Sequence, residues 1–124
     1  MTTISHIVLE LAREQGHPLG DRSHGSHLYL PLNGDGRIDK DAFPAVKHYT
    51  RVRRFRPGED EAHGRIEHGP GGHYQFIYGQ GGDRVEEAGY RLETERFVPG
   101  EYVSVREDDG VLHTFQVISV KRDD

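Results

Sequence analysis

The sequence predicts a mainly β (α+β) fold, namely a small antiparallel β-barrel or roll of about seven short strands with one short helix near residues 41–49. Sixteen glycines in 124 residues indicate frequent turns, which suit short strands better than long helices. Apolar segments follow one another without the regular exchange of strands and helices that a parallel sheet requires. At this length residues 1–124 form a single domain, because a second would lack a core of its own.

The first apolar segment, residues 4–13, fits two descriptions. Ile4, Ile7 and Leu11 follow the spacing of one helical face, whereas Ile7, Leu9 and Leu11 alternate as strand residues do. A short apolar run cannot be assigned by its period alone. We predict a strand here, because the rest of the chain is rich in strand patterns.

The next part of the chain is predicted to hold a loop, a strand, a turn and the short helix. Pro, Gly, Asp and Ser gather in the loop at residues 16–25, and three leucines share one face of the strand at residues 27–32. After a turn at residues 33–36, Asp41 is predicted to cap the helix and Pro44 to lie in its first turn, where proline is tolerated.

The turn before the helix shares residue types with a calcium-binding loop. Asn33, Asp35 and Gly36 match the centre of such a loop, but Pro31 and Ala42 stand where its strongest oxygen ligands are needed. We therefore interpret the segment as an asparagine–glycine turn.

The C-terminal hairpin can be placed in register from its apolar residues. A three-residue turn ending at Gly110 sets Val103 opposite Phe115 and Val105 opposite His113, and glycine takes the left-handed turn position without steric cost. His113 is then interpreted as a hydrogen-bonded histidine at the core edge. The residues expected to face the core are Val103, Val105, Phe115 and Val117.

A second hairpin has one register that pairs apolar residues. Setting His68 opposite Tyr74 brings Ile66 opposite Phe76. The remaining segments are assigned by alternation and by their flanking turns, including a turn at residues 79–84. Strands are predicted in this second half at residues 50–56, 64–68, 74–78, 90–97 and 101–107, with a return strand through residue 120.

Charge and composition exclude several classes of protein. The net charge of −5 and the pI near 6.0 disfavour a nonspecific nucleic-acid binder. The apolar run at residues 7–12 is far below the roughly 20 residues that span a bilayer, and it lacks the basic flank of a signal peptide. Without cysteine there are no disulfides or thiolate metal sites, and we expect a cytoplasmic protein.

One stretch, residues 51–56, is locally basic. Val52 and Phe55 are three residues apart, so a β-bulge at Arg53 and Arg54 would be needed to bury both. Bulges often direct side chains into sites, and clustered arginines suit anionic ligands. We predict that Arg53 and Arg54 bind a ligand; the alternative is that the stretch pairs with the acidic runs at residues 59–61 or 86–87.

The chain has nine histidines, and three of them are weak candidates for a metal site. His63, His68 and His73 recur every five residues, with Asp60 and Glu61 just before them. Zinc binds these residue types. A spacing of five fits neither one helical face nor one strand face, so no metal site is assigned.

Four segments together resemble a family of small, uncharacterised bacterial proteins. They are residues 6–13 (HIVLELAR), 51–55 (RVRRF), 70–72 (PGG) and 96–120. The resemblance covers nearly the whole chain. It implies a single small domain with no assigned activity, and it identifies no functional residues.

The motifs of common enzyme classes are missing from the sequence, and no catalytic residue or cofactor is predicted. We therefore predict a non-enzymatic binding or accessory module that recognises a protein or a small anionic ligand, with neither nucleic acid nor membrane as its partner. Two alternatives stay open. One is a metal-binding protein or metal-dependent enzyme that uses the clustered histidines, and the other is a structural subunit that dimerises through a sheet edge.

Overall fold

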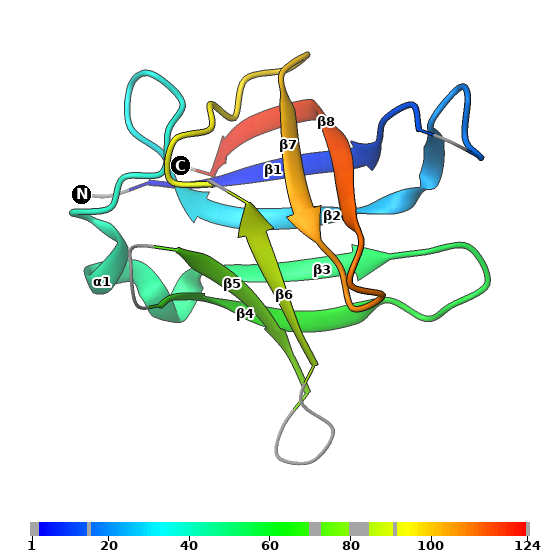
Figure 1. The fold of residues 1–124 in the computed structure, drawn as a ribbon. Coiled ribbons are helices and arrows are strands. Elements are labelled where there is room, and N and C mark those ends of the chain that lie inside the picture. The colour runs from blue at the N-terminus through cyan, green and yellow to red at the C-terminus, as the bar shows by residue number, and fades with distance from the viewer. Residues whose placement is uncertain (1–2, 15, 70–72, 80–84, 91, 124) are drawn as a thin grey trace.

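The computed structural model describes residues 3–14, 16–69, 73–79, 85–90 and 92–123. The described residues form eight strands in a closed antiparallel barrel, in which each strand pairs with its neighbours in the chain and β8 pairs with β1 (Figure 1). The predicted mainly β fold with one short helix is confirmed. The strands are β1 Ile4–Leu11, β2 Asp21–Pro31, β3 Arg51–Phe55, β4 Ala62–His68, β5 Tyr74–Tyr78, β6 Val85–Tyr90, β7 Tyr102–Arg106 and β8 Leu112–Asp123.

The short helix lies in the connection between β2 and β3, at one end of the barrel (Figure 1). It consists of α1, Phe43–Val46, followed by the 3₁₀ turn η1, Lys47–Tyr49. Pro44 lies in the first turn as predicted, but Asp41 is not the cap. Ala42 takes the N-cap position, and its backbone N–H donates to Asp39 Oδ1 at 3.1 Å.

Both predicted hairpin registers are confirmed. In the C-terminal hairpin Val103 pairs with Phe115 and Val105 pairs with His113, and Gly110 has a φ of +78°. In the second hairpin Ile66 pairs with Phe76 and His68 pairs with Tyr74.

The choice of a strand for residues 4–13 is confirmed as well, because β1 pairs with both β2 and β8. Its inward side chains Ile7, Leu9 and Leu11 are buried. The interior of an eight-stranded barrel is just wide enough for side chains to fill it. The fully buried large side chains are Tyr74, Phe76, Phe97, Ile7, Leu9, Leu28, Leu30, Ile77, Leu92, Val52, Val103 and Val117.

Two predicted boundaries are wrong. The loop at residues 16–25 ends early, because β2 begins at Asp21, which pairs with Leu11 at the end of β1. The strand predicted at residues 90–97 is also misplaced; β6 ends at Tyr90, and the described residues 92–97 form a turn and an irregular segment instead of a strand. The predicted turn at residues 79–84 lies, apart from Gly79, outside the described residues.

The physical reason for the second error is the spacing of two anchors. Leu92 and Phe97 are both buried, yet an odd separation of five would put them on opposite faces of a strand. The chain therefore takes an irregular path between them, and the Phe97 N–H donates to the Gly36 carbonyl at 2.8 Å.

The predicted β-bulge in β3 is also wrong. Residues 51–55 pair without interruption with β2, and residues 51–54 do so with β4, so Val52 points inward and Phe55 outward. Phe55 is half-buried against the ring of His27, with ring centroids 5.5 Å apart. The barrel has its irregularities in β1 instead, between Val8 and Leu9 and between Glu10 and Leu11.

Among the helices of the described residues, none combines the length and the apolar character that crossing a membrane would require.

We expect Gly25→Ala to destabilise the barrel strongly. A Cβ at this position would overlap with the Leu9 carbonyl oxygen and would lie 2.8 Å from the Phe55 ring. Because a backbone atom cannot move aside cheaply, the free energy of unfolding should fall by about 3 kcal/mol. Urea unfolding would measure this change.

Gly34→Ala is the matched control, because nothing lies within 4 Å of its Cβ position. We expect a change of no more than about 0.5 kcal/mol. Equal effects of the two substitutions would contradict the close packing of β1 against β2 at Gly25.

Candidate functional site

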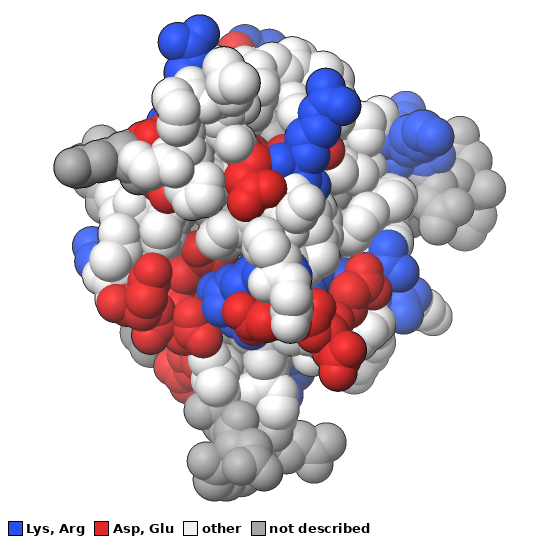
Figure 2. All heavy atoms as spheres, turned by 90° about the vertical axis from the view of Figure 1, so that its right-hand side faces the viewer, with Lys and Arg blue, Asp and Glu red and all other residues white. Residues whose placement is uncertain are grey.

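A cluster of buried charges occupies the end of the barrel opposite α1. Glu87 on β6 accepts hydrogen bonds from Arg54 Nη1 and from Arg56 Nη2, both at 2.9 Å. Arg56 Nη2 also donates to Glu107 Oε2 at 2.8 Å. The side chains of Glu87 and Glu107 are only 2% and 4% exposed. Figure 2 faces this end and shows acidic and basic side chains interleaved across it.

Strand alternation places these charges in the interior. On β3 the inward positions are Val52 and Arg54, and the chain brings Arg56 in just beyond the end of the strand. The Arg54 guanidinium lies over the ring of Tyr78, 4.7 Å from its centroid. Charges this deeply buried are tolerated because each one has an opposite charge and hydrogen bonds.

Two histidines extend the cluster toward the barrel rim. His24 Nε2 lies 2.9 Å from Glu107 Oε1. His113 Nε2 lies 2.9 Å from Asp109 Oδ2, and its Nδ1 lies 3.2 Å from the Glu14 carboxylate. The prediction that His113 is a hydrogen-bonded histidine at the core edge is confirmed.

Burial and pairing move the pKa values of the two buried carboxyls in opposite directions. Burial raises the pKa of Glu87 and outweighs the lowering by Arg54. Burial also acts to raise the pKa of Glu107, but hydrogen bonds from His24 and Arg56 outweigh it, and the pKa lies below its ordinary value. Burial lowers the pKa of His113, but hydrogen bonds with Asp109 and Glu14 give a net rise.

Arg54 belongs to this cluster, so the structure separates the two arginines that the sequence grouped as ligand contacts. They are neighbours on a regular strand, and neighbouring strand residues point to opposite faces. Arg54 is committed to Glu87, as the alternative of pairing with residues 86–87 anticipated. Only Arg53 points outward.

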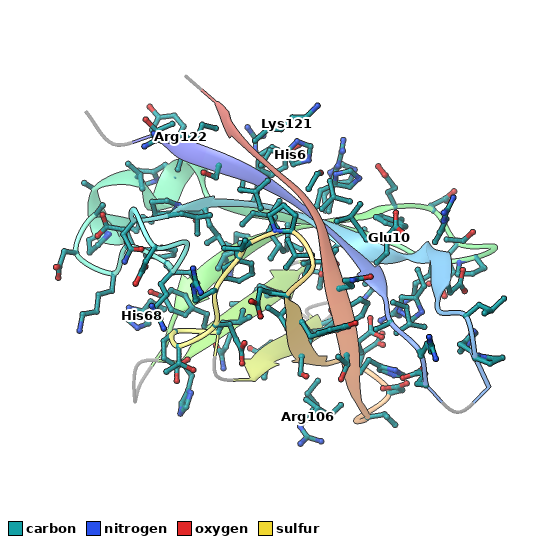
Figure 3. The ribbon with its side chains drawn as sticks, turned by 90° about the horizontal axis from the view of Figure 1, so that it is seen from above. His6, Glu10, His68, Arg106, Lys121 and Arg122 are labelled. Atoms are coloured by element: carbon teal, nitrogen blue, oxygen red, sulfur yellow. The ribbon has the colours of Figure 1, made fainter. Side chains whose placement is uncertain are left out.

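The outward positions of five neighbouring strands form a basic surface. In one cross-strand row Lys121 pairs with His6, His6 with Tyr29, Tyr29 with Arg51 and Arg51 with Arg65. In the adjacent row His27 pairs with Arg53 and Arg53 with His63. Figure 3 shows His6 and Lys121 side by side on this side of the barrel. We call this surface the basic face: His6, His27, Tyr29, Arg51, Arg53, His63, Arg65 and Lys121.

The basic face holds more positive charge than its own acids neutralise. Arg51 is exposed, lies 5.4 Å from the Tyr29 ring centroid, and has no carboxylate at ion-pair distance among the described residues. Arg53 Nε is buried without a hydrogen-bond partner in the described structure, and its nearest carboxylate, Glu61, is 3.9 Å away. Arg65 pairs with Glu67 at 2.7 Å, yet it stands directly across from Arg51, and like charges so placed repel.

Stacked rings fix the centre of the basic face. The rings of His6 and Tyr29 are nearly parallel with centroids 4.6 Å apart, and His6 Nε2 lies 2.8 Å from His27 Nδ1. Burial, then the nearby charges of Arg53 and His6, lowers the pKa of His27. Burial is thus the main reason why His27 resists protonation, and the neighbouring positive charges add to it.

The three candidate metal ligands lie in three different surroundings. His63 is on the basic face, His68 stacks on the Tyr74 ring with centroids 4.4 Å apart, and His73 lies 3.7 Å from Glu93. His63 and His68 are five residues apart on β4, which is roughly 17 Å along a strand. Within the described parts of the chain, no three histidine, aspartate or glutamate side chains gather closely enough to hold a metal ion.

The sequence analysis missed Glu107, His24 and Arg56. A signal for Glu107 was present, because it continues the alternation of Val103 and Val105 and so falls on the core-facing side. His24 lay in a segment interpreted as a loop, and its partner Glu107 is 83 residues away. Local sequence patterns do not indicate a pair of residues so far apart in the chain.

Comparison with protein-family models, curated proteins and solved structures gave no match. The resemblance to a family of small bacterial proteins therefore stays a prediction.

We expect Glu107→Gln to lower the free energy of unfolding at pH 7 by about 3 kcal/mol, because it removes the buried carboxylate that pairs with Arg56 and hydrogen-bonds to His24. The effect should depend on pH. Since the pKa of Glu107 is below its ordinary value of 4.5, its ionised form stabilises the fold above that pH, and this stabilisation is lost as the pH falls through the folded pKa. Urea unfolding of both proteins from pH 7 to pH 3 would test this.

The difference in the free energy of unfolding between wild type and variant should become smaller below pH 4.5. The pKa of Glu87 is raised mainly by burial, but the charge of Glu107 contributes to the rise, so Glu87 should ionise more readily in the variant. Glu101→Gln, at an exposed site, is the control and should leave the curve unchanged. A gap that stays constant with pH would show that Glu107 acts through packing alone.

Proposed function

We propose that this protein is a non-enzymatic binding module whose basic face recognises an acidic segment of a partner protein. The observation that carries the proposal is the pair of incompletely neutralised arginines, Arg51 and Arg53, side by side with His63 and Arg65 on one face of an otherwise acidic chain. Clustered guanidinium groups bind carboxylates in a geometry that adds specificity to charge.

The distribution of charge favours a short acidic segment over a long polyanion. The chain carries a net charge of −5 although the basic face is positive, so acidic side chains predominate over the remaining surface. A long nucleic acid would also meet that acidic surface, whereas a short segment meets only the basic face. At physiological ionic strength charges beyond about 8 Å are largely screened, which makes the local face decisive.

The shape of the basic face supports an extended ligand. It crosses five strands, β8, β1, β2, β3 and β4, which at about 4.8 Å per strand gives a width near 19 Å. Tyr29 adds apolar surface between the cations, and the half-buried Phe55 adds more next to the row of His27 and Arg53. Aromatic and arginine side chains together are typical of protein-binding surfaces.

The other two hypotheses have less support. Each described strand has two hydrogen-bonded neighbours, so dimerisation through a sheet edge lacks the edge that it needs. The three candidate metal ligands do not come together. We also propose that the protein is located in the cytoplasm, because a chain without cysteine needs no oxidising compartment.

Fluorescein-labelled decaglutamate is a suitable probe, with fluorescence anisotropy as the measurement. We expect saturable binding that weakens steeply as salt is raised, because it depends on exposed charges. The double variant Arg51→Gln/Arg53→Gln should bind at least about fivefold more weakly, as expected for the loss of two partly screened ion pairs. Arg106→Gln is the matched control, because Arg106 is exposed and lies away from His6 and Lys121 (Figure 3).

Two outcomes would contradict the proposal. If single-stranded oligothymidylate of equal charge binds more tightly than decaglutamate, the basic face is a nucleic-acid surface. If decaglutamate binds wild type and the double variant alike, the basic face is not its site.

A further inference from the structure

A second candidate site lies at the end of the barrel that carries α1, away from the basic face. A pocket of about 590 Å³ is formed there between the segment before α1 and the hairpin of β4 and β5. Its chemistry is set by Asp39, Asp41, His68, Tyr74 and Glu93. Figure 3 shows His68 well apart from His6 and Lys121.

Two buried polar atoms at this pocket have no hydrogen-bond partner among the described residues. They are Tyr74 Oη, on a residue that is 0% exposed, and Glu93 Oε2. Both residues line the pocket. Buried polar groups are nearly always hydrogen-bonded, so two unpaired atoms at one pocket indicate a missing partner.

Tyr74 cannot turn away to find a partner elsewhere. Its ring lies parallel to the ring of His68, with centroids 4.4 Å apart, and edge-on to Phe43 at 5.3 Å. Burial, and then the negative charges of Glu93 and Asp39, raises the pKa of Tyr74. The hydroxyl is therefore neutral, and it lies near enough to Glu93 and Asp39, two of the three carboxylates that line the pocket, to feel their charges.

The charges at the pocket favour a cation. Three carboxylates, Asp39, Asp41 and Glu93, line it against the two cations Arg37 and Lys40, which leaves a net negative charge. The guanidinium of Arg37 is already held by Asp35 and by the Thr94 carbonyl. The described residues offer no set of three ligands close enough for a metal ion. A larger cation can reach separated acceptors, and the rings of Tyr74 and His68 give its apolar part a surface.

We propose that this pocket binds a small organic cation with N–H donors, a primary ammonium or a guanidinium, which donates to Glu93 Oε2 and Tyr74 Oη. This inference is independent of the proposed function, since its ligand has the opposite charge and its residues lie outside the basic face.

NMR titration of the full chain with n-butylammonium tests the proposal, with backbone amide shifts as the readout. We expect saturable, millimolar binding with shifts centred on Tyr74 and Glu93. Trimethylbutylammonium has the same charge and chain but no N–H, and it should bind at least about tenfold more weakly because it leaves both acceptors unpaired. Butyrate should not bind.

Glu93→Gln and Tyr74→Phe should each weaken butylammonium binding at least about fivefold, as expected for the loss of one hydrogen bond. Tyr74→Phe should not lower the melting temperature, because the hydroxyl it removes makes no hydrogen bond to the described protein. Glu101→Gln and Tyr102→Phe, both at exposed sites, are the controls.

Three results would overturn the proposal. Shifts that do not saturate would show that butylammonium has no specific site on the protein. Equal binding of trimethylbutylammonium would remove the role of the N–H donors. Unchanged binding in Glu93→Gln and Tyr74→Phe would place the cation elsewhere.

Discussion

The contact of Glu87 with Arg54 and Arg56 is the interaction on which the rest of this barrel depends. β3 and β6 are not neighbours in the sheet, so these ion pairs cross the barrel interior. They lie next to the shortest ladder among the described strands, β6 to β7, which has three residue pairs. Arg56 pairs with Glu87 on β6 and with Glu107 just after β7. It thereby links both strands of this short ladder to the end of β3.

The same contact decides which arginines face outward. Residues on a strand alternate between the two faces, so a slip of β3 by one position would bring Arg53 and Phe55 inside and put Arg54 on the surface. Glu87 would then be buried without its partner, which is strongly unfavourable. The ion pair of Arg54 with Glu87, on the inward side of β3, therefore fixes Arg51 and Arg53 on the basic face.

The sequence predicts the parts of this fold that local rules control. Val103, Val105 and Phe115 admit one hairpin register, and Gly110 fits the turn which that register needs. Local rules could not predict the segments whose partners are distant in the chain. Leu92 and Phe97 resemble strand residues in the sequence, and only the structure shows that the Phe97 N–H donates to the distant Gly36 carbonyl.

The candidate sites show the same division. The basic stretch at residues 51–56 is visible in the sequence, but its separation into inward and outward arginines depends on Glu87, 33 residues from Arg54. The pocket at Tyr74 was not foreseen, because Asp39 and Glu93 are far apart in the chain and meet only when the barrel closes.

Two candidate sites of opposite charge can coexist on this small barrel because their charges are arranged differently. On the basic face the cations are outward, on neighbouring strands about 4.8 Å apart, so their fields add. At the Tyr74 pocket the carboxylates come from the connection before α1 and from the segment after β6, and the stacked rings of His68 and Tyr74 line the same pocket. Solvent screens the remaining electrostatic interaction between the charges of the two sites. Each site therefore presents its own charge to a ligand, and the net charge of −5 describes neither of them.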